Sequence, residues 1–294
     1  MMTSRSTQER VCRFHHRHDR APPRIAAMTE AGVVDLSVAG ITSLAAVLDA
    51  ADPTGVVRAA RAAAGPPLPL ADVVLLPPVE RQEVWAAGVT YLRSKTARME
   101  ESDFSATAYD RVYEAPRPEI FFKAVADKVV GPGDGVGIRA DSRWNVPEPE
   151  LALVMNSRGD LVGCTIGNDM SSRDIEGENL LYLPQAKVYD RSCGLGPWIV
   201  LGCSEAEARE WTVSITIDRA GREVFAGRTR IDQIKRSFTE LADYLRRSQS
   251  FPHGVVLLTG TGVVPDESFT LAAGDRVSIT IDGIGTLENP VMVV

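Results

Sequence analysis

From residue 83 onward, the chain is a succession of short runs rich in Val, Ile, Thr and aromatic residues. Examples are EVWAAGVTY from residue 83, TVSITIDRAGREVFAG from residue 212 and RVSITIDGIGTLENPVMVV from residue 276. Gly, Pro and Asp turns separate the runs, which is typical of strands, and the DRAG sequence predicts a hairpin. An apolar stripe at helical spacing between residues 231 and 245 predicts one amphipathic helix. The pattern therefore predicts an α+β fold in which strands dominate.

The N-terminal part has a different composition. Residues 1–24 are polar and contain HHRHDRAPPR, which favours a flexible N-terminal arm. Two Ala-rich helical patterns follow, and the Pro-rich passage GPPLPLADVVLLPP then interrupts helical periodicity. We therefore expect a small N-terminal α/β domain over residues 25–79 and a main domain over residues 80–294.

Composition narrows the function. The 294 residues carry a net charge of −7, which argues against a partner dominated by nucleic-acid phosphates or anionic lipid. The four cysteines show no C-x-x-C spacing, which suits a reducing cytoplasm and offers no zinc site of the usual kind. No apolar stretch has the length of a membrane span. We expect a cytoplasmic protein that acts on a small molecule, with no nucleic-acid or membrane partner.

Three carboxylates are candidate metal ligands. Glu148 and Glu150 lie one residue apart in EPELALVM, and strand side chains two apart share a face. Asp169, in GNDMSSRDI, ends another predicted strand. Hard cations such as Mg²⁺ or Mn²⁺ prefer such oxygen ligands. Spacing alone leaves open the alternative that the glutamates lie on a solvated face and that Asp169 only begins a helix.

Five motifs in order resemble the fumarylacetoacetate hydrolase superfamily from about residue 80 to the C-terminus: EPELALVM, GNDMSSRDI, LPQAKVYDRSCGLGPWIV, LLTGTG and GDRVSITIDGIGTLENPV. The resemblance implies a catalytic domain with a mixed β-roll over residues 80–294. It also implies a divalent cation, usually Mg²⁺, bound by Glu148, Glu150 and Asp169. A homodimer or homotetramer is expected on the same ground.

Within this superfamily, NDMSSRDIEGENLLYLPQAKVYD is most similar to the 2-keto-3-deoxy-pentonate (arabinonate or xylonate) dehydratase branch. The acylpyruvate hydrolases carry a water-activating His after a G-x-x-Y turn, whereas AGVTYLRSK places Ser94 there. The resemblance thus implies a lyase of pentose catabolism. It would dehydrate a 2-keto-3-deoxy-pentonate to 2,5-dioxopentanoate through a metal-stabilised enolate. The alternatives are a hydrolase or decarboxylase of acylpyruvate-like diketo acids, and a non-enzymatic protein that binds sugar acids.

The same resemblance implies roles for further residues. Lys187 in PQAKVYD matches the active-site lysine of the superfamily, and Glu176 stands where the hydrolases often have Gln, so both are expected to be catalytic. The residues expected to bind substrate are Thr261, Lys123, Arg93 and Ser94, the last two on a segment that often forms a mobile cover. Arg173 and Asp174 are expected to form a structural ion pair beneath the site.

Overall fold

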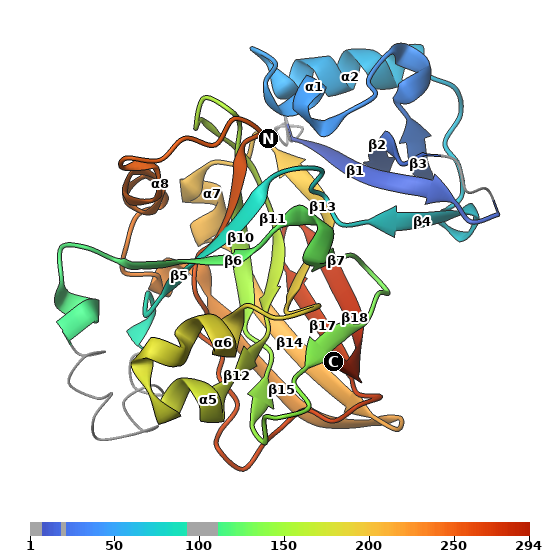
Figure 1. Ribbon diagram of the computed structural model, residues 1–294. Helices are drawn as coiled ribbons and strands as arrows, with labels where there is room; N and C mark the ends of the chain where they lie inside the picture. Colours follow the sequence, from blue (N-terminus) through green and yellow to red (C-terminus); the bar gives the residue numbers. More distant parts are fainter. Residues whose placement is uncertain (1–7, 19–21, 93–110) are drawn as a thin grey trace, which may run out of the picture.

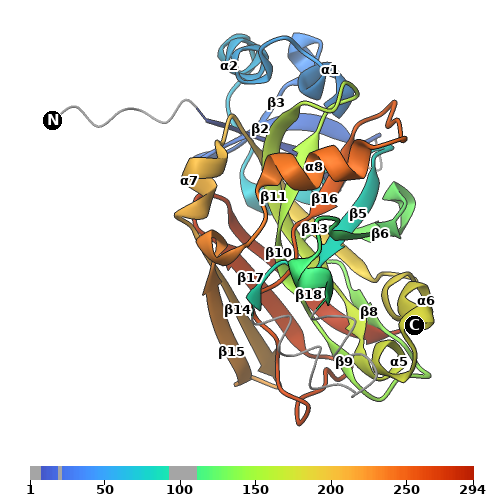
Figure 2. The same ribbon diagram turned by 90° about the vertical axis from the view of Figure 1, so that its left-hand side faces the viewer.

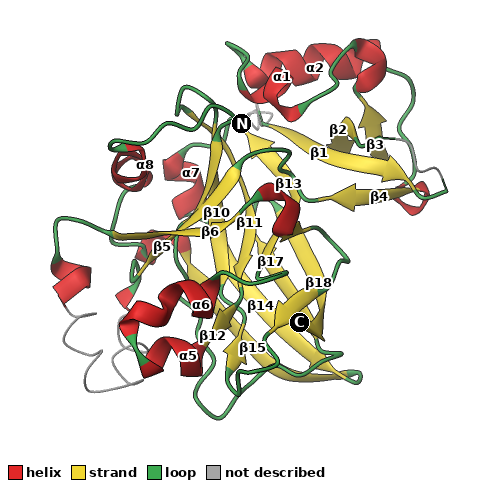
Figure 3. Cartoon of the chain, in the orientation of Figure 1, coloured by secondary structure: helices red, strands yellow, loops and turns green. Residues whose placement is uncertain are grey.

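The computed structural model describes residues 8–18, 22–92 and 111–294. Strands dominate it, and the helices lie around their edges (Figure 3). The predicted strand-rich α+β class is therefore confirmed. Among the described residues, no helix is long and apolar enough to cross a membrane.

The larger sheet runs through both the N-terminal and the main part of the chain (Figure 1). Its strand order is β3-β2-β1-β13-β11-β10-β16-β5-β6, with β4 paired to β1 and β7 paired to β13. The bounds are β1 Glu9–His16, β2 Arg24–Thr29, β3 Gly32–Asp35, β4 Val73–Leu76, β5 Glu83–Gly88, β6 Glu119–Ala124, β7 Val129–Val130, β10 Pro149–Met155, β11 Leu161–Asp169, β13 Cys193–Leu201 and β16 Val255–Leu258.

A second sheet packs beside the first, in the order β15-β14-β17-β18-β8 (Figure 2). Its strands are β8 Val136–Ile138, β14 Thr212–Arg219, β15 Arg222–Arg230, β17 Arg276–Ile281 and β18 Gly285–Val293, and a separate two-stranded ladder joins β9 Asn145–Val146 to β12 Ser171–Ser172. The predicted hairpin joins β14 to β15. Its two turn residues, Ala220 and Gly221, have φ of 54° and 79°, as a type I′ turn requires.

The helices are short, and side chains cap several of them. Their bounds are α1 Leu44–Leu48, α2 Pro53–Ala63, α5 Arg173–Glu178, α6 Leu183–Lys187, α7 Glu205–Arg209 and α8 Phe238–Arg246, with 3₁₀ turns at Ser37–Ala39, Leu70–Asp72, Ala126–Lys128, Leu180–Tyr182 and Ile231–Gln233. The amphipathic helix expected between residues 231 and 245 is α8. It begins only at Phe238, because the Ser237 side chain accepts the backbone N–H of Glu240 and caps the helix there.

The expectation of a flexible arm is wrong for Glu9–His16. These residues form β1, which pairs with β2, β4 and β13, and Val11 and Phe14 are fully buried. The polar composition of this segment did not indicate a strand, and two of its three partners, β4 and β13, are distant in sequence. Of the rest of the arm, residues 1–7 and 19–21 lie outside the described residues. The boundary between a small N-terminal domain and a main domain at residues 79 and 80 stays a prediction. Val11 of the N-terminal part packs in the same core cluster as Leu195 and Ile199 of β13.

Candidate metal centre

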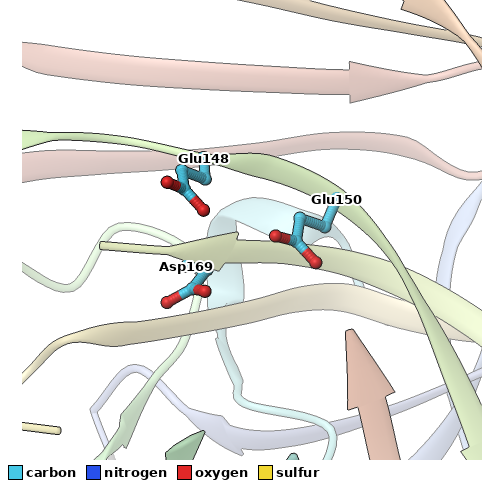
Figure 4. A group of neighbouring side chains, drawn as sticks. All are labelled: Glu148, Glu150 and Asp169. Carbon is cyan, nitrogen blue, oxygen red and sulfur yellow. The ribbon is translucent and has the colours of Figure 1, made fainter. Parts of the chain in front are cut away.

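Three carboxylates converge where β10 and β11 lie side by side. Glu148 precedes β10, Glu150 lies within it and Asp169 is the last residue of β11. The backbone N–H of Asp169 donates to the carbonyl of Glu148 at 3.0 Å, which fixes the register of the two segments. The three side chains are only 3%, 2% and 1% exposed, and each offers an oxygen within 4.8 Å of the others. Figure 4 shows them pointing toward one another. The alternative of a solvated face is therefore excluded.

Two buried cationic side chains form ion pairs with Glu148. The Arg173 guanidinium donates to Oε1 at 2.6 Å, and Lys187 Nζ donates to Oε2 at 2.8 Å. The expected ion pair between Arg173 and Asp174 is therefore wrong. Asp174 instead accepts the Ser142 hydroxyl at 2.6 Å and the Arg143 N–H at 2.7 Å. Adjacent helix side chains point in different directions, so Arg173 faces the carboxylates while Asp174 caps a neighbouring turn.

Lysines also surround Asp169. Lys187 Nζ donates to its Oδ2 at 3.0 Å and to the Ser171 hydroxyl at 2.5 Å, and Lys123 Nζ lies 2.5 Å from Oδ1. Lys123 further donates to the carbonyls of Met170 and Lys187, at 2.9 and 2.5 Å. Burial lowers the pKa of Lys123, although the carboxylate of Asp169 opposes that change. Lys123 thus ties the Asp169 and Lys187 segments together.

Glu150 is in a different electrostatic position. Its Oε2 accepts the backbone N–H of Gly260 at 2.5 Å, and no ion pair joins it to a cation among the described residues. Burial, followed by the charges of Asp169 and Glu148, raises the pKa of Glu150 well above its ordinary value. A hard divalent cation among these oxygens would supply the missing positive charge. The donor set therefore fits a metal ion such as Mg²⁺.

The backbone beside Glu150 is shaped for a close approach. Gly260 has a φ of 90°, and a Cβ added there would lie 2.1 Å from the Thr90 hydroxyl oxygen. Only glycine therefore lets this N–H reach the carboxylate. Val89, which also lines the pocket, has a φ of 53°, which is unusual for a β-branched residue and marks local strain of the kind found at functional sites.

A small pocket opens onto the three carboxylates. Its other lining residues are Ala87, Gly88, Val89, Phe121, Arg173, Gly260 and Thr261. Thr261 is thus placed at the site, although its hydroxyl also exchanges hydrogen bonds with the backbone of Val263. Lys123 does not line the pocket. Its amine faces Asp169 and two carbonyls, so its contacts are those of a residue that positions the site.

The remaining expected site residues are Glu176, Arg93 and Ser94. Glu176 is buried in α5, one helical turn after Arg173, but it does not line the pocket. Arg93 and Ser94 lie outside the described residues.

Two further residues that the sequence did not indicate lie at the site. The Ser171 hydroxyl accepts a hydrogen bond from the Lys187 ammonium. Glu119 lies against the pocket wall, since a Cβ added to Gly88 would be 2.1 Å from its Oε2. The strand sequence EIFFKA could have indicated Glu119, because strand alternation places Glu119, Phe121 and Lys123 on one face. Phe121 lines the pocket and Lys123 reaches Asp169, so this face of β6 is turned toward the site.

Residues 83–292 match the family described as fumarylacetoacetate (FAA) hydrolase C-terminal, so the chain belongs to this family. A relative from Haloferax volcanii, named "Probable 2-keto-3-deoxyxylonate dehydratase", is 51% identical over 217 residues, which is 74% of each chain. The 2-dehydro-3-deoxy-D-arabinonate dehydratase of Saccharolobus solfataricus is 41% identical over 223 residues, which is 75% of each chain. The expected resemblance to the dehydratase branch is confirmed.

The fold also resembles a solved structure of 2-keto-3-deoxy-D-arabinonate dehydratase, complexed with magnesium and 2,5-dioxopentanoate. The identity is 31% and the TM-score 0.82, over 97% of this chain and 99% of that chain. This likeness includes the N-terminal part as well as the segment that matches the family.

Proposed function

We propose that this protein is a Mg²⁺-dependent hydro-lyase that converts a 2-keto-3-deoxy-pentonate, the arabinonate or the xylonate, into 2,5-dioxopentanoate. The observation that carries the proposal is the buried cluster of Glu148, Glu150 and Asp169 beside Lys187, at the bottom of a small pocket. The relatives at 41% and 51% identity are named for this chemistry, and the similar solved structure holds magnesium and the dioxopentanoate.

Glu148, Glu150 and Asp169 would hold the metal. When bound, Mg²⁺ would supply Lewis acidity toward a 2-oxo acid and stabilise the enolate that forms as a C3 proton leaves. The fit rests on Glu150, a buried carboxylate without a cationic partner in the described part of the chain. Arg173 and Lys187 form ion pairs with Glu148 and keep the cluster ordered. Glu150 has no such ion pair among the described residues, so a bound cation would stabilise its carboxylate.

Lys187 moves or holds a proton in this scheme. Its ammonium already lies between Glu148, Asp169 and the Ser171 hydroxyl, which gives the proton a defined set of acceptors. Thr261 at the pocket wall binds the substrate carboxylate through its hydroxyl or backbone. Lys123, Arg93 and Ser94 were expected to bind substrate as well. The contacts of Lys123 favour a positioning role, and the other two remain predictions.

Loss of the C4 hydroxyl needs a proton donor. Glu176 was expected to supply it, but Glu119 has the better position, because its carboxyl lies against Gly88 in the pocket wall. Its neighbours along the same strand face, Phe121 and Lys123, already contribute to the site. We therefore assign the acid–base role at C3 and C4 to Glu119 together with Lys187, and keep Glu176 as the alternative.

The proposal also covers the substrate class, the cellular location and the oligomeric state. Its substrate would be a small 2-oxo sugar acid, it would work in the cytoplasm as part of pentose catabolism, and it would form a homodimer or homotetramer. The cysteine pattern supports the location, and family resemblance supports the assembly.

Turnover of a substrate panel tests the function. Purified protein is incubated with several 2-keto-3-deoxy sugar acids, with Mg²⁺ or with excess chelator, and an aldehyde product is measured. We expect aldehyde from a pentonate only when Mg²⁺ is present. Full activity in chelator would contradict the metal site. No turnover of any 2-oxo acid by the Mg²⁺-loaded protein would favour the binding protein over the enzyme.

A further inference from the structure

Two thiols meet on the side of the main core that is covered by α7. Cys164 lies in β11 and Cys203 lies two residues after the end of β13, and their Sγ atoms are 2.7 Å apart. Non-bonded carbon atoms sit at about 3.5–4.0 Å, and sulfur is larger than carbon. A disulfide bond measures about 2.03–2.05 Å. The two sulfur atoms are therefore much closer than packed neighbours and need only a small movement to bond.

The backbone holds both cysteines in this arrangement. Cys164 pairs with Val200 in the antiparallel ladder between β11 and β13. Past the end of β13, the N–H of Gly202 still donates to the carbonyl of Val162 at 3.2 Å. Gly202 has a φ of 74°, so the chain turns there and returns Cys203 toward β11. A covalent bond would thus keep the existing strand pairing.

The other two cysteines differ from this pair. Cys12 and Cys193 are fully buried and have no sulfur partner, although all four cysteines are among the described residues. Burial raises the pKa of each of these two thiols to about 12, which keeps them protonated and unreactive. Cys203, by contrast, is half-buried, so a small oxidant in solvent can reach it.

We propose that Cys164 and Cys203 are an oxidation site that closes to an intramolecular disulfide on exposure to a peroxide. The Cys203 thiolate attacks one peroxide oxygen, the O–O bond breaks, and Cys203 becomes a sulfenic acid while one water is released. The Cys164 sulfur then attacks the sulfenic sulfur, and the S–O bond breaks with release of a second water. In total, two thiols lose two electrons and two protons, and one hydrogen peroxide is reduced to two waters.

The order of attack follows from the local electrostatics. The hydrogen bond to Cys203, then burial and the nearby Glu207 carboxylate, raise the pKa of Cys164. Cys164 therefore stays a thiol until Cys203 has been oxidised, and it acts second. The acidic neighbour also makes the reaction slower than at a cysteine beside cationic groups.

The disulfide would tie β11 to the start of α7 without entering the metal centre. Cys164 packs in the core cluster with Ile166 and Val200, whereas the alternation of β11 turns Asp169 to the opposite face. The bond would span 39 positions along the chain, which constrains the unfolded state appreciably. We expect oxidation to raise the melting temperature by several degrees and to leave turnover unchanged.

Peptide mapping of the peroxide-treated protein tests the site. The full-length protein is exposed to increasing hydrogen peroxide, blocked with a thiol reagent, digested without reductant and analysed by mass spectrometry. The expected result is one peptide pair joined through Cys164 and Cys203, lighter by two hydrogens, with Cys12 and Cys193 still blocked as thiols. Oxidation of Cys203 to sulfinic or sulfonic acid with no joined pair would overturn the proposal, as would a disulfide through any other pair.

Two variants check the stability effect. Cys203→Ser should lose both the joined peptides and the rise in melting temperature on oxidation, and Cys12→Ala should keep both. If Cys203→Ser still gained stability from peroxide, the pair would not be the cause. Peptide mapping needs only the wild-type protein, so it tests whether Cys164 and Cys203 form a disulfide even if a variant folds poorly.

Discussion

The Arg173 guanidinium donates to Oε1 of Glu148 at 2.6 Å, so a residue of α5 orients a carboxylate of the metal centre. Both side chains are almost completely buried. Partners that orient metal ligands in this way tune metal affinity although they do not touch the metal. The helix that follows the NDMSS segment is thus part of the metal centre.

Arg173→Met should weaken Mg²⁺ binding by about 10- to 100-fold, because Glu148 loses the group that orients it. The variant should also be less stable, by about 3–5 kcal/mol, since a buried carboxylate loses one of its cations. Calorimetric titration with Mg²⁺ measures the affinity, and circular dichroism checks folding. Arg143→Met is the matched control, because Arg143 is exposed and should bind Mg²⁺ as the wild type does. Unchanged affinity in Arg173→Met would remove Arg173 from the metal centre.

Mg²⁺ binding should release protons. Burial and the charges of Asp169 and Glu148 raise the pKa of Glu150, so the metal-free protein keeps a proton there at pH values where an ordinary glutamate has lost it. Metal binding requires the carboxylate form, so the apparent affinity should fall as the pH falls. Titration in two buffers of different ionisation enthalpy measures the released protons. Glu150→Gln should abolish both tight binding and proton release, whereas the exposed Glu178→Gln should change neither.

The raised pKa of Glu150 also makes the stability of the metal-free protein depend on pH. The folded metal-free protein binds a proton at Glu150 that the unfolded chain, with its ordinary pKa, has already lost. This stabilisation is present at low pH and is lost as the pH rises through the raised pKa. Saturating Mg²⁺ should reverse the trend, because the metal stabilises the folded state by mass action. A melting temperature indifferent to Mg²⁺ would argue against a site in the folded protein.

Lys187→Met should lower turnover by about 10²- to 10⁴-fold, the loss typical of an acid–base group. Mg²⁺ binding should survive with reduced affinity, because Lys187 orients Glu148 and Asp169 but does not itself supply a metal ligand. Steady-state kinetics and Mg²⁺ titration separate the two effects. Lys128→Met, at an exposed lysine, is the control. A decrease of less than about threefold in Lys187→Met would show that Lys187 takes no part in the chemistry.

Glu119→Gln should damage turnover more than Glu176→Gln, because the Glu119 carboxyl lies beside Gly88, a residue of the pocket wall. We expect Glu119→Gln to slow the loss of the C4 hydroxyl by at least about 10²-fold. Mass spectrometry in D₂O follows exchange of the C3 protons and formation of the product at the same time. The reverse order of effects would return the acid–base role to Glu176.

Local sequence patterns predicted the parts of this protein that depend on neighbouring residues. The two-residue spacing of Glu148 and Glu150 predicted convergent side chains, and the DRAG turn predicted the β14–β15 hairpin. Pairings between distant segments were not predictable in this way. The strand β1 pairs with β13, which lies about two thirds of the chain length away in sequence. Arg173 pairs with Glu148 and not with the adjacent Asp174 because of how α5 packs against the site. Glu119 was overlooked because its position matters only once β6 lies beside the pocket.

The fate of the substrate carbons distinguishes dehydration from cleavage of the carbon chain. A 2-keto-3-deoxy-pentonate labelled with ¹³C at every carbon is incubated with the Mg²⁺-loaded protein, and the products are followed by NMR. Dehydration removes only water, so we expect a single product in which all five labelled carbons remain connected and one is an aldehyde. Labelled pyruvate with a two-carbon fragment would show C–C cleavage. Rapid conversion of an acylpyruvate to pyruvate and a second acid, with no dehydration of the pentonate, would contradict the account and favour the hydrolase.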